Sequence, residues 1–261
     1  MRVAVFDLET NGMTGSSVLS ASSLVFDSHG ALLGLFNRFY FPQERWDART
    51  AQIHGLTPER LRALRAARPA PSYFLEDWPD LIDFWYERGV EGIVVHNLTF
   101  DTSFLPEIAQ SAFPWWCSMR GLTDWCAIPH RPGNAGTAEK RYKWPKLREA
   151  LDIFCNGPRS LPPPPRTSHI EEALGLARPH VSLWDCFELY RVVVRVALHR
   201  PDLLTFAPHV IPFQAPGKKR GRFSPSLFDP GDARFFPKSD PFTEALFACE
   251  QKLHSFCDPG G

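Results

Sequence analysis

The segment Arg2–Leu8 constrains the fold most, because apolar residues occupy both of its alternating faces, the pattern of a strand buried inside a sheet. Asp7 and Glu9 stand two residues apart, so both carboxylates point to one face of this strand. The pair is either an ordinary solvated face or half of a divalent-metal site, since hard cations bind oxygen ligands. A spacing of this kind arises by chance about once in a chain of this length, so the remaining sequence has to decide.

The elements that follow are typical of a mixed sheet flanked by helices. Gly30 separates two apolar runs and can take the positive φ of a hairpin turn, which makes the first three strands antiparallel neighbours. A fourth strand begins at Gly92. The second and third strands are expected over 18–26 and 32–41, and helices over 74–88, over 145–154, from Pro179 or His180 to Leu198, and from Pro58 with Thr57 as N-cap.

Composition indicates a folded protein without a strong overall electric field. The chain has 261 residues, of which 44% are hydrophobic, and this is enough for a core of ordinary size. Its 29 basic and 29 acidic residues balance, so any binding to a polyanion has to come from local patches. Charge therefore neither supports nor excludes nucleic acid as a partner.

The cysteines and the apolar runs predict a cytoplasmic protein. None of the 6 cysteines forms a C-x-x-C pair or a zinc-type spacing, which is typical of free thiols in a reducing compartment. No apolar run reaches the roughly 18 residues of a membrane helix, and the first apolar segment meets Asp7 before it attains signal length. We therefore expect no membrane association and no targeting segment.

Two regions interrupt the pattern of helices and strands. Residues 157–166 contain four consecutive prolines and are expected to form an extended surface loop. Beyond about residue 200 the sequence becomes rich in Pro, Gly and charge, so we expect a domain over 1–200 and a tail over 201–261. The tail contains a basic stretch, 217–222, and an amphipathic helix that begins at Pro241.

Two further acidic residues follow predicted elements at a distance from the first strand. Asp101 falls in the first turn of the helix after the fourth strand, close behind Asn97. A lone Asp there would ordinarily cap the helix, and Asn97 could bind the backbone at the strand end. Asp185 follows His180 by five residues on a late helix and has apolar neighbours in sequence, which favours burial against a sheet. Each of these residues alone has a structural explanation.

Together the three stretches resemble the DnaQ-like, or DEDD, 3′–5′ exonucleases of the ribonuclease H-like fold. The matching motifs are FDLETNG with Asp7 and Glu9, HNLTFDTSFL with Asp101, and HVSLWD with His180 and Asp185, supported by QIHGLTPE at 52–59 and RYKWPKLREALDIF at 141–154. The resemblance covers about residues 1–200, and the ordered coincidence of five stretches is far more specific than any single one.

The third motif is similar to the histidine branch of that family, DEDDh. Val181 occupies the position at which the other branch has a tyrosine, and His180 stands five residues before Asp185. Two features depart from the family pattern: Ser182 replaces a residue that is often Ala, and the proline-rich segment is longer than the usual connection. Neither departure removes a metal ligand.

The resemblance implies a fold, a cofactor and a mechanism. The fold would be an α/β ribonuclease H-like sheet of five strands, with three antiparallel strands first and parallel strands after them. The cofactor would be two divalent ions, Mg²⁺ or Mn²⁺. Asp7 would bridge both ions, Glu9 and Asp185 would complete one site, and Asp101 would serve the other, mostly through water. His180 would be the general base that activates the attacking water.

Substrate contacts are expected around these motifs. The stretch from Lys140 to Arg148 interleaves five cations with two aromatic residues, so Lys143 could contact a phosphate and Trp144 could stack on an unpaired base. Trp144 could equally begin an amphipathic helix from inside the core. The other candidates for substrate binding are Leu8, Thr10, His54, Asn97, Phe100 and Phe104.

The leading hypothesis is an exonuclease acting on single-stranded DNA or a 3′ overhang, in proofreading, repair or CRISPR adaptation. The alternatives are the same chemistry on short RNA, because the motifs report the phosphate and not the sugar, and a non-catalytic module that binds nucleic acid or protein. The complete set of acids and the histidine argues against the last. Residues 217–261 could recruit a protein partner, and SPSLF at 224–228 is similar to peptides that dock on bacterial sliding clamps.

Overall fold

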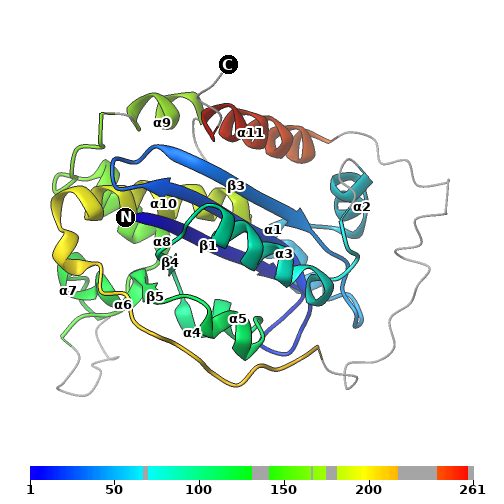
Figure 1. The fold of residues 1–261 in the computed structure, drawn as a ribbon. Helices are drawn as coiled ribbons and strands as arrows, with labels where there is room; N and C mark the ends of the chain where they lie inside the picture. Colours follow the sequence, from blue (N-terminus) through cyan, green and yellow to red (C-terminus); the bar gives the residue numbers. More distant parts are fainter. Residues whose placement is uncertain (67–69, 131–140, 166, 175–180, 217–239, 258–261) are drawn as a thin grey trace.

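A five-stranded mixed sheet forms the centre of the computed structural model, which describes residues 1–66, 70–130, 141–165, 167–174, 181–216 and 240–257 (Figure 1). The strand order is β3-β2-β1-β4-β5, with β1, β2 and β3 antiparallel and β4 and β5 parallel to β1. The strands are β1 (Arg2–Thr10), β2 (Val18–Asp27), β3 (Leu32–Phe39), β4 (Gly92–Val95) and β5 (Trp115–Cys117). This arrangement confirms the expected sheet.

Helices cover both faces of the sheet. On one face α10 (Ser182–His199) lies across β1 and β2, and on the other α3 (Phe74–Glu87) packs with Trp85 against Phe6 at 5.3 Å between ring centroids (Figure 1). Among the described residues no helix combines the length and the apolar character that crossing a bilayer requires. The remaining helices are α1 (Ala48–His54), α2 (Pro58–Ala66), α4 (Leu98–Thr102), α5 (Glu107–Ser111), α6 (Ser118–Gly121), α7 (Thr123–Cys126), α8 (Leu147–Leu151), the π-helical turn η1 (Asp152–Asn156), α9 (Ser168–Leu174), the 3-10 turn η2 (Pro201–Leu203) and α11 (Pro241–Cys257).

The alternation of β1 divides the core into two layers. Val3 and Val5 belong to the apolar cluster beneath α10, whereas Phe6 and Leu8 belong to the cluster beneath α3. Because successive side chains point to opposite faces, the next odd position, Asp7, points to the α10 face. The acidic carboxyl end of the central strand therefore faces α10, a helix that follows much later in the sequence.

The structure differs from the sequence expectations at several elements: the helix expected over 145–154 is α8 followed by η1, and α10 and β5 also differ. Val181 has extended dihedral angles, φ −135° and ψ 124°, so α10 begins at Ser182 and not at Pro179 or His180, which lie outside the described residues. A proline favours a first helical turn locally, but the bonds of Ser182 to the sheet fix the start. β5 was not located because three residues are too few for a periodic signal.

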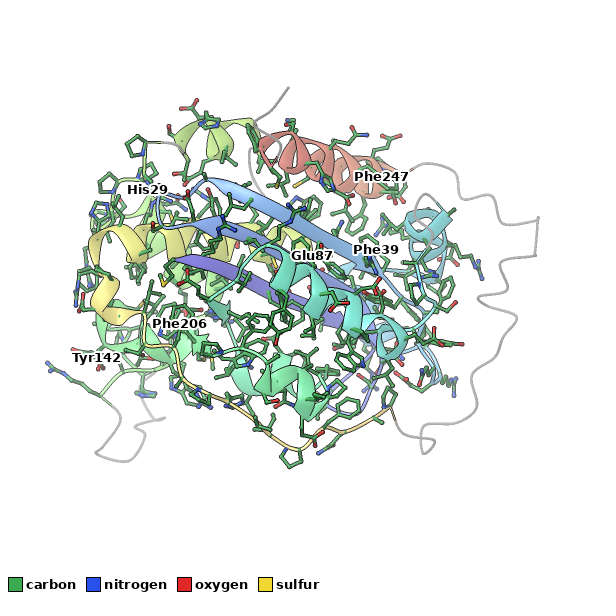
Figure 2. All side chains as sticks on the ribbon, viewed as in Figure 1. His29, Phe39, Glu87, Tyr142, Phe206 and Phe247 are labelled. Carbon is green, nitrogen blue, oxygen red and sulfur yellow. The ribbon has the colours of Figure 1, made fainter. Side chains whose placement is uncertain are left out.

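The segment that follows η2 packs beside β5, at one end of the sheet. Ala207 pairs with Trp115 through two backbone hydrogen bonds of 2.8 and 3.0 Å, so the segment beyond η2 covers the outer side of β5. Phe206, which Figure 2 labels, lies close to Gly92: a Cβ atom on Gly92 would meet the phenyl ring at 2.5 Å. Phe206 and Ala207 therefore lie against the sheet, and farther along the segment the amides of Ile211 and Phe213 donate to Gln110 and Glu107 of α5 at 2.7 and 2.9 Å.

The last helix, α11, packs along β3 and adds an apolar stripe to the core beneath α10. Four of its five predicted stripe residues are buried and the fifth is partly buried: Phe242, Leu246, Cys249 and Leu253, and then Phe256. The stripe is therefore occupied within the protein. The basic stretch 217–222 and the SPSLF segment 224–228 lie outside the described residues, so a protein partner for residues 217–261 stays a prediction.

The proline-rich segment is attached to α10. Residues 157–165 contain neither helix nor strand, as expected of an extended loop. Two bonds fasten this loop: Arg195 Nε donates to the carbonyl of Leu161 at 2.9 Å, and His199 Nε2 lies 2.9 Å from the carbonyl of Pro162. The loop thus has a fixed course over the helix that carries Asp185.

Candidate active site

Asp7 and Glu9 lie at the carboxyl end of β1 and face α10. Their antiparallel partners on β2 are Ser22 and Ser20. Small hydroxyl side chains at these two positions leave space above the strand, and both are fully buried. The acidic end of the central strand is therefore enclosed by polar groups as well as by the helix.

Asp185 reaches the same place from the first turn of α10. The helix is anchored there by Ser182, whose Oγ lies 2.7 Å from Ser22 Oγ and also bonds to Ser20 Oγ. As a result, one ligand oxygen each from Asp7, Glu9 and Asp185 lies within 4.8 Å of the others. Such a cluster of carboxylate oxygens is the donor set that Mg²⁺ and Mn²⁺ prefer. No other comparable group is found in the described part of the chain.

Asp101 approaches the cluster from α4, directly after β4. The backbone amides of Asn97 and Asp101 act to lower the pKa of this carboxyl, as expected of an acid at a helix start, but burial outweighs them. The side chain is 3% exposed, and this burial raises the pKa of Asp101 to about 8. A position at the helix start therefore does not keep this acid away from the cleft that Asp7, Glu9 and Asp185 also line.

Burial and mutual repulsion govern the protonation of the strand carboxylates. Burial raises the pKa of Asp7 well above its ordinary range, and the charges of Asp185, Asp101 and Glu9 raise it further. The pKa of Glu9 is raised by burial first and then by Asp185 and Asp101. Acids held this closely are stable as anions only when positive charge joins them, which is the environment of a divalent-cation site. The residues therefore fit a divalent-metal cofactor.

The cluster opens into a cleft of about 640 Å³ between β1, α4, α8 and α10. Of the substrate-binding candidates, Leu8, Asn97, Phe100 and Trp144 line this cleft together with the four acids. Trp144 is 47% exposed, and the guanidinium of Arg120 lies 5.6 Å from its ring centroid. The indole thus lies at the cleft with much of its surface accessible, and not inside the core.

The other four candidates for substrate binding do not line the cleft. Thr10 is buried and donates its hydroxyl to the carbonyl of Gly12 at 2.7 Å. His54 is buried on α1, where Nδ1 accepts the backbone amide of Leu56 at 3.0 Å. The other two engage protein groups: Phe104 packs edge-on against Phe100 at 5.1 Å, and Lys143 bonds to Glu149 at 2.6 Å.

His180, expected as the general base, lies outside the described residues. A second histidine, His96, does line the cleft, at the end of β4. Its Nε2 faces the carbonyl of Pro145 at 3.1 Å, and its Nδ1 lies 2.9 Å from the hydroxyl of Ser118. A carbonyl only accepts, so Nε2 carries the proton and Nδ1 accepts from Ser118. Burial lowers the pKa of His96 to about 4, so the ring is neutral and both nitrogens are occupied.

Sequence reasoning also missed a buried acid next to the cluster. Glu188 follows Asp185 by three positions on α10, so it lies on the same side of the helix and lines the cleft. It is 3% exposed and pairs with Arg148 Nη1 at 3.3 Å. The helical spacing from Asp185 was the signal that could have identified it. The remaining cleft residues are Met119, Pro145 and Leu147, which were not anticipated, and Lys146, which belongs to the basic stretch expected to contact phosphate.

Comparisons with solved structures identify the fold. A full-length 3′-exonuclease matches with a TM-score of 0.53 and 13% identity over 82% of this chain and 95% of its own. Exonuclease X in complex with 5′ overhanging duplex DNA matches with a TM-score of 0.47 and 21% identity over 76% and 93%. The zinc-bound complex of Escherichia coli ExoI with single-stranded DNA gives 0.47 and 16% over 77% and 42%. The first of these shows that this chain shares its fold with a 3′-exonuclease. No family model and no curated protein matches the sequence.

Proposed function

We propose that this protein is a metal-dependent 3′–5′ exonuclease of the DEDDh type, acting on the 3′ end of single-stranded or overhanging DNA. The observation that carries the proposal is the convergence of Asp7, Glu9 and Asp185 from a central strand and a late helix, with Asp101 in the same cleft. The fold shared with a 3′-exonuclease supports this reading. Residues far apart in the sequence thus bring their carboxylates together in one cleft.

The four acids would hold two divalent ions, Mg²⁺ or Mn²⁺. Asp7, Glu9 and Asp185 provide one site, and Asp101, with Asp7 shared, provides the other. When bound, such ions lower the pKa of a coordinated water and stabilise the charge on the departing 3′ oxygen. The raised pKa values of Asp7 and Glu9 support this assignment, because the cations would relieve the repulsion that raises them.

His180 would take the proton from the attacking water. It stands five residues before Asp185 in the sequence, and imidazole titrates in the pH range in which a base is useful. His96 is unsuited to this role, because Nε2 donates to a carbonyl and Nδ1 accepts from a hydroxyl. The proposal therefore assigns the general base to His180 and not to His96, the histidine that lines the cleft.

The chemistry of the cleft supports a single-stranded end as substrate. Phe100 and Trp144 offer aromatic surface to bases that are unpaired, and stacking of this kind tolerates any sequence. Lys146 lies on the same cleft and adds positive charge to it, which favours a phosphate backbone as ligand. A paired base has its faces covered by its neighbours, so a frayed or overhanging end fits better than a blunt duplex.

A labelled-substrate assay tests the proposal. The 5′-labelled substrates are single-stranded DNA, duplex with a 3′ overhang, and RNA, each with Mg²⁺, with Mn²⁺ or with EDTA. We expect a stepwise ladder of shortened products with either metal and none in EDTA. Faster cleavage of RNA would replace the DNA assignment by an exoribonuclease, and no ladder on any substrate would refute the exonuclease and favour the non-catalytic alternative.

Matched variants test whether the acidic cleft produces the ladder. Asp7→Asn and Asp185→Asn keep the side-chain shape and should abolish cleavage, whereas Glu59→Gln, on the exposed side of α2, should cleave as the wild type does. His180→Ala should lower the rate by about 10² or more, as for a lost general base. Unchanged turnover in Asp7→Asn or Asp185→Asn would refute the site.

A further inference from the structure

A groove runs along β3, the edge strand at the opposite end of the sheet order from β5. It has a volume of about 440 Å³ and lies between α3 on one side and α11 on the other (Figure 1). We call it the edge groove. Its lining residues are Leu35, Phe36, Asn37 and Arg38 of β3, Asp80, Asp83, Phe84 and Glu87 of α3, and Glu250 and His254 of α11.

The backbone of β3 presents unpaired groups to this groove. Tyr40 donates its amide to the carbonyl of its partner Leu19 at 2.8 Å, which makes this a hydrogen-bonded pair. Such pairs alternate along an antiparallel ladder, so Phe36 is also bonded to β2, while the amides and carbonyls of Leu35 and Asn37 point outward. Among the described residues no hydrogen bond reaches these outward groups. An edge of this kind is a template for another strand.

The side chain of Asn37 adds a second unpaired group. It is 7% exposed, and its Oδ1 accepts the hydroxyl of Ser22 at 2.9 Å. Its Nδ2 is buried and has no hydrogen-bond partner in the described part of the chain. A buried donor without an acceptor is destabilising by about 1–3 kcal/mol. The lining of the groove thus includes a residue with a donor whose acceptor the described part of the protein does not supply.

The walls of the groove are acidic. Asp80, Asp83 and Glu87 follow one side of α3 at helical spacing (Glu87 is labelled in Figure 2), and Glu250 faces them from α11. Arg38 already pairs with Asp80 at 2.9 Å. Asp83 and Glu87 are exposed and have no ion-pair partner among the described residues. The groove therefore has an excess of negative charge.

The spacing of these acids identifies the kind of cation that fits. In the described residues only Asp7, Glu9 and Asp185 bring their oxygens close enough to hold a metal ion, so the acids of the edge groove do not form such a site. They are instead distributed along the strand edge. Charges distributed in this way match a chain of positive side chains, spaced along an extended backbone.

We propose that the edge groove binds an extended, basic peptide segment of a partner protein, which adds a strand to β3. The backbone of the segment pairs with the outward groups of Leu35 and Asn37, and its Lys or Arg side chains lie along Asp83 and Glu87. Main-chain bonds supply affinity in this mode of recognition, and the alternate side chains supply specificity. The site is separate from the acidic cleft and does not depend on nuclease activity.

A binding experiment with the full-length protein tests the charge requirement. The probe is a fluorescein-labelled hexapeptide that alternates lysine and valine, and the readout is fluorescence anisotropy. We expect Asp83→Lys/Glu87→Lys to bind at least tenfold more weakly than the wild type. The control Glu59→Lys/Glu172→Lys makes the same charge change at exposed positions outside the groove and should bind as the wild type does. Equal weakening in both variants, or in neither, would overturn the proposal.

Two further measurements test the added strand. A peptide of equal charge, N-methylated on alternate amides, loses the bonds to β3 and should bind at least tenfold more weakly. Hydrogen exchange at the amides of Leu35 and Asn37 should slow when the unmethylated peptide binds. If the methylated peptide binds equally well, or if these amides exchange at an unchanged rate, strand addition is excluded. Thermal melts of each variant verify that it is folded.

Discussion

The Oγ atoms of Ser182 and Ser22 lie 2.7 Å apart and join the first turn of α10 to the strand beside Asp7. Ser22 donates to Asn37, so Ser182 donates to Ser22, and Ser20 donates to Ser182. Ser182→Ala leaves the buried Ser20 hydroxyl without its acceptor and should lower the free energy of unfolding by about 1–3 kcal/mol in urea titrations.

The double variant Ser20→Ala/Ser182→Ala checks this explanation. With both hydroxyls removed, no donor is left unpaired by the loss of Ser182, so the double variant should be more stable than the sum of the single losses predicts. A coupling of about 0.5 kcal/mol or more is expected for groups in one network. Strictly additive losses would show that the hydroxyls do not act together.

The metal-free protein should become more stable when Asp101 is neutralised. Burial raises the pKa of Asp101 from 3.8 to about 8, so the folded state holds this proton more tightly than the unfolded state. Its contribution to stability is complete below about pH 4 and is lost as the pH rises through 8. Asp101→Asn, which cannot ionise, should therefore raise the melting temperature in EDTA most at pH 9 and least at pH 4.

Melts in EDTA at pH 4, 7 and 9 measure this trend. Asp124→Asn, an exposed Asp on α7, is the control and should change the melting temperature little at any pH. A stabilisation by Asp101→Asn of the same size at all three values would show that the raised pKa is not its cause.

Trp144 should contribute to substrate affinity and little to stability. Stacking of a base on an aromatic side chain is worth about 1–3 kcal/mol. Trp144→Ala should therefore raise KM for single-stranded DNA by about tenfold with a small change in kcat, and Trp144→Tyr should restore most of the affinity. Its 47% exposure predicts an unfolding midpoint close to that of the wild type. An unchanged KM for Trp144→Ala would exclude stacking there.

The helix α11 should be an integral part of the fold. Leu253 is fully buried against the core, so Leu253→Ala should lower the free energy of unfolding by about 2–5 kcal/mol. Leu198 is 46% exposed, and Leu198→Ala makes the same change on a surface with a loss below about 0.5 kcal/mol. Equal effects of the two substitutions in urea titrations would mean that α11 does not share the core.

Periodicity in the sequence was sufficient to predict the long elements. The apolar stripe from Phe242 to Leu253 is buried as its spacing indicates, and Gly30 has the positive φ, 83°, that a hairpin turn requires. Asp7 and Glu9 face the same layer because side chains alternate along a strand, which holds whatever surrounds it. These features depend on local geometry alone.

Other features depend on contacts between distant residues, and the sequence does not show these. The start of α10 is fixed by hydroxyls of β2 about 160 residues earlier, which outweighs the local preference of a proline for the first helical turn. His54 and Trp144 belong to equally suggestive stretches, yet the first is buried on α1 and the second lies at the cleft. Only the packing of the elements separates them.

The segment beyond η2 pairs with β5 at one end of the sheet, and α11 packs on the face of β3 that α10 also covers, leaving the outer edge of β3 open within the described residues (Figure 1). Both are translated after every strand. A nascent chain that already contains the whole sheet therefore still displays the apolar surface that Leu246 and Leu253 will cover. During synthesis this surface is exposed, so chaperones can bind it and it can aggregate. It is buried only after α11 has left the ribosome and packed against it.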